Sequence, residues 1–482
     1  STVSRNHAVL TRYDDGSWTI SDASSKTGTW VNGDRVDICA LHEGDTVSIG
    51  GVDMTLQPIT KRQEQLQSQL RTRGSGPISS IFGLILLTLL QAAMLMGFLL
   101  SGVEEEYPSY VLGFCSVAIC QWGLFLFYTV IHRSSFEVET LAFFLCTLGM
   151  AAIATVKPGE ILKQAAAMVL GVLTFLLIGW SLRDLERAKR CRYLAVLLGV
   201  GFLVITLLFG REYYGAKNWL VIGGLSLQPS ELSKVCFVYA GASTMDRIMN
   251  KRNLILFIAY SVVICGLLAL MNDFGTAMIF FCAFLIIAYL RSGSVGTIAL
   301  ACTALGFAGV LAIRIAPHAL NRFATWRHIW ENPYSSGYQQ TQAIMCIASG
   351  GLFGLGAGKG FLQKVFAADS DIVFATISEE WGLLLALLAV LVVAALGFFA
   401  IRTSRVSRSS FYCIGGCTAA GILLIQAALN CLGTVDVLPF TGVTFPFLSN
   451  GGTSMIGAWG LLAFVKAADT RQNASFAVRY TK

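Results

Sequence analysis

Acidic and amide side chains that bear on group-transfer chemistry gather in polar segments between long apolar runs. Glu331 and Asn332 directly precede Pro333 in one such segment. A carboxylate accepts a proton from an attacking hydroxyl group, whereas an amide does not do so at neutral pH. The two neighbours therefore differ in whether their side chains can take part in proton transfer.

Basic side chains in two polar segments would suit an anionic substrate. Arg211 and Lys217 lie in one segment, and Arg322 and Arg327 lie in another. Charge-assisted hydrogen bonds from such groups to an anion contribute roughly 1.5 to 3 kcal/mol each. Lysine and arginine also anchor helices at membrane interfaces, so both roles remain open.

A second set of charged residues lies in or beside apolar segments. Glu231 and Lys234 are three residues apart, which places them on one face of a helix. Because unpaired charge is costly there, we expect them to face one another or a cavity, and a purely structural ion pair is the alternative to a binding role. Asp273, Glu379 and Glu380 lie at predicted helix ends, where carboxylates cap helices or tune a site.

Composition excludes several classes of protein. The chain is 55% hydrophobic and only 13% charged, with a mean hydropathy of +0.65, so lipid must solvate much of it. Its 13 cysteines form no C-x-x-C pairs and predict neither a metal site nor disulfides. The net charge of +7 is scattered, which argues against nucleic-acid binding. Lys359 is followed by Gly360 instead of Ser or Thr, so the glycine-rich stretch is not an ATP-binding loop.

The apolar segments predict an all-α polytopic membrane protein with about twelve transmembrane helices, each long enough to cross a hydrocarbon core of about 30 Å. They cover residues 78–101, 109–131, 138–156, 161–182, 193–210, 229–246, 253–271, 274–291, 296–315, 381–402, 411–433 and 449–468. Arginine and lysine clusters place both termini in the cytoplasm and residues 316–380 in a large outer loop. The segment 229–246 is the weakest of these predictions.

The first residues form a different kind of domain. Short alternating strands separated by turn residues predict a small all-β domain over residues 1–58. A polar linker follows over residues 59–77 and ends in Gly-Pro. The transmembrane domain then covers 78–470, and a cytoplasmic tail covers 471–482.

The N-terminal domain resembles FHA domains. The resemblance rests on Ser4-Arg5-Asn6-His7, on Asp22 to Gly33 and on Leu41 to Asp45. It implies binding of a phosphothreonine protein through Ser4, Ser25, Lys26 and Thr27, with His7 and Asn32 holding the loops. The principal phosphate-binding Arg of the family lies upstream of Ser4, so we expect the domain to be truncated in this chain.

The membrane part resembles the SEDS family, which comprises FtsW, RodA and SpoVE. The motifs occur in order as Gly215 to Leu220, Gln228 to Lys234, Asp273 to Ala277, Asn332 to Gln339, Ala348 to Leu352, Asp371 to Ala375, Glu379 to Gly382, and Pro439 to Ser454.

The SEDS resemblance implies a peptidoglycan glycosyltransferase that polymerises lipid II at the outer face of the bacterial cytoplasmic membrane. A class B penicillin-binding protein would be its partner, and the resemblance leaves open a Mg or Mn cofactor. The substrate-binding residues implied are Arg211, Lys217, Trp219, Glu231, Lys234, Asp273, Arg322, Gln339, Asp371, Glu379, Glu380, Ser449, Gly451 and Gly452.

One departure from the family pattern concerns the catalytic position. The family places its essential Asp directly before the Pro of the long outer loop, and Asn332 stands there instead. Three explanations follow: Glu331 replaces the base, the Asn is an introduced or inactivating change, or the protein is a scaffold that couples phosphothreonine signalling to wall synthesis. A transporter of lipid-linked precursors is a further alternative.

Overall fold

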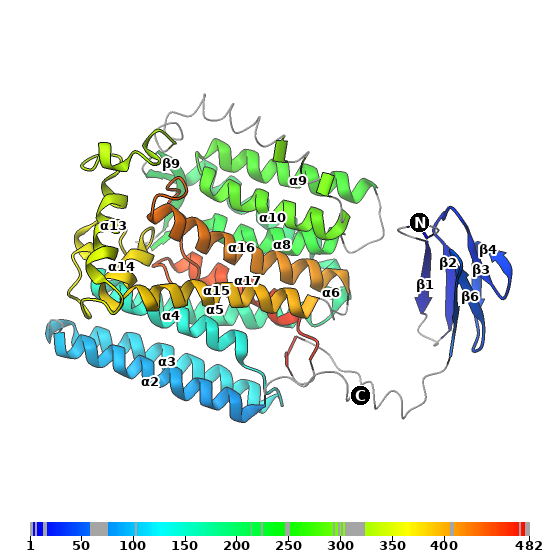
Figure 1. Ribbon diagram of the computed structural model, residues 1–482, viewed down its shortest axis with the longest axis horizontal. Helices are drawn as coiled ribbons and strands as arrows, with labels where there is room; N and C mark the ends of the chain where they lie inside the picture. The colour runs from blue at the N-terminus through cyan, green and yellow to red at the C-terminus, as the bar shows by residue number, and fades with distance from the viewer. Residues whose placement is uncertain are drawn as a thin grey trace. The chain divides into compact units, whose positions relative to one another are not determined.

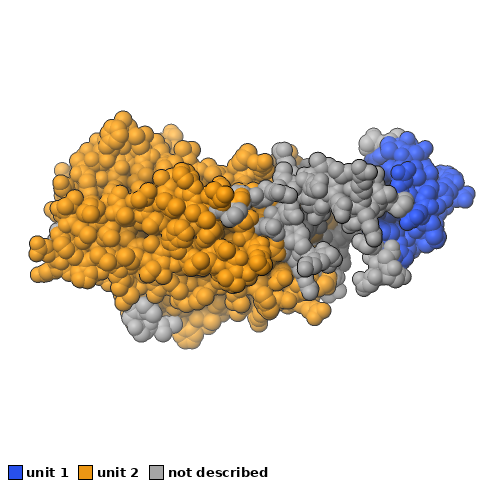
Figure 2. All heavy atoms as spheres, turned by 90° about the horizontal axis from the view of Figure 1, so that it is seen from below, with its two compact units in different colours: residues 1–72 blue, residues 73–482 orange. Residues whose placement is uncertain are grey.

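The structure is a computed structural model that describes residues 3–4, 7–12, 17–57, 76–101, 104–213, 215–222, 225–245, 251–292, 295–296, 299, 302–303, 323–404, 409–471 and 474–477. The contacts between residues divide the chain into two compact units, residues 1–72 and residues 73–482 (Figure 2). Most of the predicted linker and the predicted span 296–315 lie outside the described residues.

The N-terminal unit is built from two antiparallel sheets (Figure 1). One sheet has the order β1–β2–β5 and the other β4–β3–β6–β7. The strands are β1 (Ala8–Arg12), β2 (Trp18–Asp22), β3 (Thr29–Val31), β4 (Asp34–Val36), β5 (Ile38–Leu41), β6 (Thr46–Ile49) and β7 (Val52–Thr55). Ile20 and Leu41 from the first sheet meet Val31 and Val47 from the second in a small core. The all-β prediction is therefore confirmed.

The Asn-Gly pair between β3 and β4 forms the predicted tight turn. Asn32 and Gly33 have φ angles of 54° and 93°, which a two-residue hairpin turn requires. Trp30 pairs with Arg35 across the turn. The Asp14-Asp15-Gly16 turn lies outside the described residues.

The second unit is a helix bundle. Its helices are α2 (Pro77–Ser101), α3 (Tyr107–Val130), α4 (Glu137–Val156), α5 (Ile161–Leu182), α6 (Leu185–Arg190), α7 (Arg192–Phe209), α8 (Pro229–Met245), α9 (Lys251–Leu270), α10 (Phe274–Ser292), α13 (Tyr338–Gly350), α14 (Val373–Trp381), α15 (Leu383–Ser404), α16 (Ser410–Thr434) and α17 (Gly452–Ala467). Short 3₁₀ turns are η1 (Glu104–Glu106), η2 (Pro158–Glu160), η3 (Ile329–Glu331) and η4 (Leu362–Lys364).

Among the described residues, nine helices are long and apolar enough to cross a membrane. They begin at Ile78, Glu104, Glu137, Pro158, Arg192, Asn253, Phe274, Leu383 and Ser410. Two further predicted spans are the helices α8 and α17, which are shorter and lie inside the bundle. The chain is therefore a multi-pass membrane protein, as predicted.

The central and the peripheral helices of the bundle differ in how much of their surface is buried. The α2–α3 pair lies along one side of the bundle and α9 along the other, with α8, α16 and α17 between them (Figure 1). Large apolar side chains such as Leu86, Leu89 and Leu177 remain exposed on the outer helices, where lipid would cover them. By contrast, α4 is 78% buried over its most apolar stretch.

A buried charge network holds one end of this core together. Lys466 Nζ at the end of α17 lies 3.0 Å from the Glu139 carboxylate at the start of α4, and both side chains are buried. Tyr128 donates a 2.7 Å hydrogen bond to Glu139. A buried carboxylate of this kind requires a paired cation and hydrogen bonds, which Lys466 and Tyr128 provide.

Close contact between α4 and the loop before α17 requires a glycine. A Cβ atom on Gly149 would lie 2.4 Å from the carbonyl oxygen of Leu448, which is a backbone atom with little freedom to move. We expect Gly149→Ala to destabilise the protein by about 1 to 3 kcal/mol through overpacking. The melting temperature of the purified protein in detergent measures this effect.

Gly123 in α3 provides the matched control, because a Cβ atom there meets nothing within 4 Å. We expect Gly123→Ala to leave the melting temperature unchanged or to raise it, since alanine favours helix by up to about 1 kcal/mol. Equal melting temperatures for Gly149→Ala and Gly123→Ala would contradict the close packing of α4 against this loop.

Candidate functional site

Three segments meet at one end of the bundle, which we call the site end. They are the α4–α5 connector (residues 157–160), the segment 323–382 and the loop 435–451. The predicted outer loop is folded over its described part, since it contains α13 and α14 (Figure 1). Backbone turns with positive φ at Gly351, Gly354, Gly356 and Gly358 shape this segment.

Asp369 and Asn450 tie the three segments together. Asn450 donates from its backbone nitrogen to the Asp369 carbonyl oxygen at 2.8 Å and from Nδ2 to Asp369 Oδ2 at 2.6 Å. The Nδ2 atom also lies 2.7 Å from Glu160 Oε2. Lys157 Nζ completes the group at 3.0 Å from Asp369 Oδ2. We call these four residues the junction.

Side chains from α5 and α16 form hydrogen bonds with the loop backbone next to the junction. Gln164 in α5 contacts the carbonyl oxygen of Ser449 and the backbone nitrogen of Gly451, each at 3.4 Å. The Ser449 hydroxyl donates to the Ser370 carbonyl oxygen at 2.7 Å. Asn430 in α16 donates to the carbonyl oxygens of Asp371 and Val443, each at 2.9 Å. Amide and hydroxyl side chains therefore fix the backbone of both loops.

Glu331 and Asn332 lie at the surface of the segment 323–382. Glu331 is 71% exposed, and its Oε1 atom lies 2.9 Å from His328 Nδ1. The Asn332 side chain is exposed, and the backbone carbonyl oxygen of Asn332 accepts from the Gly337 backbone nitrogen at 3.1 Å. Just beyond it, Gln339 donates to the Phe366 carbonyl oxygen at 2.8 Å, which links the start of α13 to the loop that carries Asp369.

Glu379 and Glu380 are buried and bind the protein's own backbone. The carboxylate of Glu379 accepts from the backbone nitrogens of Phe361 and Leu362 at 2.8 and 2.9 Å. Thr155 in α4 donates to Glu380 at 2.6 Å, and the Gly360 nitrogen lies 3.3 Å away. These carboxylates therefore position the glycine-rich turns, and their oxygens face protein groups.

Three short strands form the polar segment between α7 and α8. They are β8 (Arg211–Tyr213), β9 (Ala216–Ile222) and β10 (Leu225–Leu227), paired in the order β10–β9–β8. Arg211 pairs with Trp219 in the register of β8 and β9. The Lys217 backbone nitrogen donates to the Met271 carbonyl oxygen at 2.9 Å, which brings this sheet to the start of α10.

Asp273 caps α10, which is one of the two roles left open for it, and a role in substrate binding remains a prediction. Its Oδ1 atom accepts from the Thr276 backbone nitrogen at 3.1 Å. Its Oδ2 atom accepts from Asn218 Nδ2, also at 3.1 Å. Both oxygens of this carboxylate therefore have partners within the protein.

Glu231 and Lys234 form the expected ion pair within α8. Glu231 Oε2 lies 2.8 Å from Lys234 Nζ, and both side chains are buried. A Cβ atom on Gly457 would lie 3.0 Å from the Glu231 carbonyl oxygen, so α17 packs directly against this turn of α8. The opposite charges of Glu231 and Lys234 neutralise each other inside the bundle. A role of this pair in substrate binding remains a prediction.

The remaining predicted site residues are spread around the site end. Arg322 lies outside the described residues, whereas the guanidinium of Arg327 lies 5.2 Å from the Trp326 ring. Asp371 accepts from the Ser370 hydroxyl at 3.0 Å. Gly451 precedes α17 and Gly452 begins it. Within the described ranges, no three His, Cys, Asp or Glu side chains are grouped to hold a metal, so we assign no residue to the divalent cation that the resemblance leaves open.

In the N-terminal unit, the predicted phosphopeptide loops are held as expected. His7 contacts the Ser4 nitrogen and the Gly28 carbonyl oxygen at 3.1 and 2.9 Å. Asn32 donates to Asp45 at 2.8 Å and accepts from the Thr46 nitrogen at 2.9 Å.

Ser25 belongs to the internal bonding of its loop. Its hydroxyl donates to Asp22 at 2.6 Å and accepts from the Gly28 nitrogen at 2.9 Å. The Ser4 hydroxyl accepts from the Lys26 nitrogen at 3.1 Å. The side chains of Lys26 and Thr27 are exposed. The hydrogen bonds from Ser25 and Thr29 lower the pKa of Asp22 to about 2, so this carboxylate stays ionised and keeps the loop closed.

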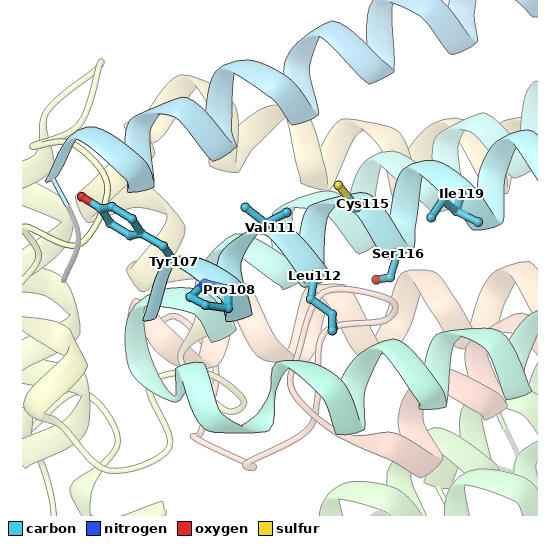
Figure 3. Close-up of a pocket in the computed structure, with 7 residues that line it drawn as sticks. All are labelled: Tyr107, Pro108, Val111, Leu112, Cys115, Ser116 and Ile119. Carbon is cyan, nitrogen blue, oxygen red and sulfur yellow. The ribbon is translucent and has the colours of Figure 1, made fainter. Parts of the chain in front are cut away.

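An apolar hollow lies along one face of α3 (Figure 3). It is lined by Tyr107, Pro108, Val111, Leu112, Cys115, Ser116 and Ile119. No carboxylate or cation lines it, so it has the character of a surface that lipid chains cover and provides no group for proton transfer or for binding a phosphate.

Sequence reasoning missed Lys157, Asp369 and the amides Gln164 and Asn430. These residues belong to none of the motifs, and the contacts of the junction join residues between 81 and 290 positions apart. One signal was present. Lys157 follows a long apolar run and precedes Pro158-Gly159, so a charged side chain at a helix end needed a partner.

A bundle of membrane-spanning helices with a polar site at one end, joined to a small β domain, defines a multi-pass membrane protein with an accessory domain. Residues 116–474 match the family model described as cell cycle protein, FtsW/RodA/SpoVE, and residues 1–50 match the FHA domain. A match over most of the chain shows that the protein belongs to the FtsW/RodA/SpoVE family. The helix α2 and the first turns of α3 precede the matched region.

Similar proteins include the peptidoglycan glycosyltransferase RodA of Mycobacterium bovis, which is 30% identical over 63% of this chain and 69% of that protein. The probable peptidoglycan glycosyltransferase FtsW of Bacillus subtilis is 30% identical over 75% of this chain and 92% of its own length. Among solved structures, a chain of a peptidoglycan synthase complex has a TM-score of 0.58 with 24% identity, covering 69% of this chain and 96% of that chain. RodA of Thermus thermophilus has a TM-score of 0.52 with 23% identity, covering 69% and 95%. These structures share the fold of the helix bundle.

Burial raises the pKa of Glu380 from 4.5 to about 7, although Thr155 and the glycine loop partly oppose this shift. Because the folded-state pKa lies above the unfolded value, ionised Glu380 destabilises the native state, and the free energy of unfolding falls as pH rises from about 4.5 to about 7. We expect Glu380→Gln to remove this fall, which amounts to on the order of 3 kcal/mol. Melting temperatures measured between pH 5 and 8, expressed as the difference between the two proteins, test it.

The control is Glu331→Gln, which changes an exposed carboxylate in the same segment. We expect its melting temperature to follow that of the unaltered protein at every pH. If Glu380→Gln followed the unaltered protein as well, the raised pKa of Glu380 would be wrong.

Proposed function

We propose that this chain is a peptidoglycan glycosyltransferase that joins lipid II molecules into glycan strands. Its family and the names of its relatives support this activity. The observation that carries the proposal is the junction, where Asn450 and Asp369 bring three segments distant in sequence to one end of a membrane-embedded bundle. A site at the end of such a bundle is accessible to a substrate with a lipid tail in the bilayer and a sugar in water.

We place the site end at the outer face of a bacterial cytoplasmic membrane, with both termini in the cytoplasm. The cluster Arg183, Arg187 and Arg190 follows α5 and so lies at the opposite end from the α4–α5 connector. Positive residues favour the cytoplasmic side of a membrane protein. The substrate and the acceptor strand would then meet outside the cell.

The proposed reaction is a displacement with inversion at the anomeric carbon of the donor sugar. A hydroxyl oxygen of the acceptor forms the new glycosidic bond while the bond to the diphosphate breaks, and the diphosphate leaves with the electron pair. The hydroxyl proton must pass to a base. Glu331 supports this role because its carboxylate is exposed, stands beside Asn332 and has His328 at 2.9 Å.

We expect Glu331→Gln to reduce glycan formation about a hundredfold or more, which is the usual loss when a general base is removed. Asn332→Asp places a carboxylate one residue further on and should keep or raise the rate. The measurement is the formation of glycan strands from labelled lipid II by the purified full-length protein.

Glu105→Gln is the matched control, because Glu105 is an exposed carboxylate in η1, which lies outside the segment 323–382 in the sequence. Polymer formation that resists Glu331→Gln would remove Glu331 as the base. Polymer that appears only with Asn332→Asp would show that the unaltered chain is inactive and would favour a scaffold role.

The scaffold is the second candidate function, and the amide at position 332 favours it. In that case the FHA domain would bind a phosphothreonine protein and the membrane part would hold the synthase complex. A class B penicillin-binding protein is the proposed partner in both cases. One structural neighbour belongs to a peptidoglycan synthase complex that coordinates polymerization and crosslinking, which supports this proposal.

We expect the full-length protein to bind a phosphothreonine peptide more tightly than the same peptide without phosphate. Lys26 is the exposed cation of the Ser25 to Thr27 loop, so Lys26→Ala should weaken binding by about tenfold, the worth of one charge-assisted hydrogen bond. Fluorescence polarisation of labelled peptides measures both effects. Thr55→Ala on the exposed strand β7 should leave binding unchanged. Equal affinity for the two peptides would argue against a phosphate-reading domain.

A further inference from the structure

The Asp369 carboxylate depends on one cation. Its side chain is only 1% exposed. The Oδ2 atom accepts from Asn450 Nδ2 at 2.6 Å and lies 3.0 Å from Lys157 Nζ, whereas the buried Oδ1 atom has no hydrogen-bond partner. Burying a carboxylate oxygen that accepts no hydrogen bond costs free energy. We therefore expect Asp369 to have a role other than stabilising the fold.

Lys157 is held at the protein surface by this carboxylate. An ammonium group has three donors, and one of them is directed to Asp369. The side chain of Lys157 is 48% exposed, so the remaining donors face the surroundings of the site end. An exposed lysine usually loses side-chain entropy when it binds a ligand, but a lysine already anchored to a buried aspartate loses less.

Other basic side chains near the site end are placed differently. Arg327 lies over Trp326, and Lys364 lies over Phe361. Lys163 lies 4.0 Å from Glu160 one turn along its own helix. Among the described residues of the site end, Lys157 is the cation whose ion pair joins two different segments.

We infer that Lys157 binds a phosphate oxygen of the lipid-linked diphosphate donor and that Asp369 and Asn450 are positioning residues for it. The inference rests on the proposed glycosyltransferase function and adds a residue that the motifs did not include. Lys157 is paired with Asp369, and Lys163 with Glu160, so the charges of these two ion pairs cancel. The diphosphate would therefore be bound by hydrogen-bond donors of Lys157 and not attracted by net positive charge. Lys157 lies at the end of a membrane-spanning helix, where the phosphate groups of lipid-linked donors are found.

A set of variants separates ligand binding from structure. Lys157→Met removes the cation and leaves Asp369 buried without its partner, which destabilises the fold as well. The double variant with Lys157→Met and Asp369→Asn removes both charges, and the side-chain oxygen of the new amide can still accept the hydrogen bond from Asn450 Nδ2. Lys157→Arg keeps a cation at the position. Lys163→Met is the matched control, since Lys163 is 58% exposed and belongs to the same connector region.

The test is the affinity of the full-length protein for undecaprenyl diphosphate, measured in nanodiscs of zwitterionic lipid. We expect the double variant to keep the melting temperature of the unaltered protein but to bind about tenfold more weakly, and Lys157→Arg to recover most of the affinity. Lys163→Met should bind as the unaltered protein does. Unchanged affinity in the double variant would overturn the inference, because the pair would then serve structure alone.

Two further outcomes matter. One distinguishes the lipid-linked diphosphate from bilayer phosphate, and the other distinguishes failure of this inference from failure of the proposed function. Phosphatidylglycerol added to the nanodiscs should not displace undecaprenyl diphosphate. If it did so in the unaltered protein but not in the double variant, Lys157 would be a site for bilayer phosphate and the inference would fail. If the unaltered protein bound no undecaprenyl diphosphate in either bilayer, the proposed glycosyltransferase function would fail together with the inference.

Discussion

The hydrogen bonds between Asn450 and Asp369 are the constraint on which the architecture of the site end depends. One side-chain and one backbone hydrogen bond join the loop before α17 to the segment between α10 and α15 at this point. Because Asn450 also contacts Glu160, the same residue fixes the α4–α5 connector. Gly149 permits the close approach, since its missing side chain leaves room for the Leu448 carbonyl oxygen.

This arrangement separates residues that build the site from residues that face it. Glu379, Asp273 and Glu231 have their oxygens directed to backbone nitrogens, an amide or a lysine inside the protein. Glu331 and Lys157 are instead exposed at one side and held by a partner at the other. A glycosyl transfer needs a base for one reactant and a cation for the leaving group, and these two residues have the matching chemistry.

Sequence patterns predicted the parts of the fold that arise from local order. Long apolar runs fixed the helices, and alternation with the Asn32-Gly33 turn fixed the strands of the N-terminal domain. Spacing alone indicated that Glu231 and Lys234 could face one another, whereas position at a helix end left open whether Asp273 caps the helix or tunes the site. The junction could not be predicted in this way, because Lys157, Asp369 and Asn450 are brought together only by tertiary packing. Their types are polar and common, and no periodicity links them.

The segments joined at the junction form, in our central claim, a glycosyltransferase site. The direct measurement is the rate of glycan formation from labelled lipid II by the purified protein, alone and with the proposed class B penicillin-binding protein, compared between the unaltered chain and Asn450→Ala. We predict polymer from the unaltered chain and a large loss of rate in Asn450→Ala at temperatures where that variant remains folded. No polymer from the unaltered chain in either setting, or an equal rate in the folded Asn450→Ala variant, would contradict this claim.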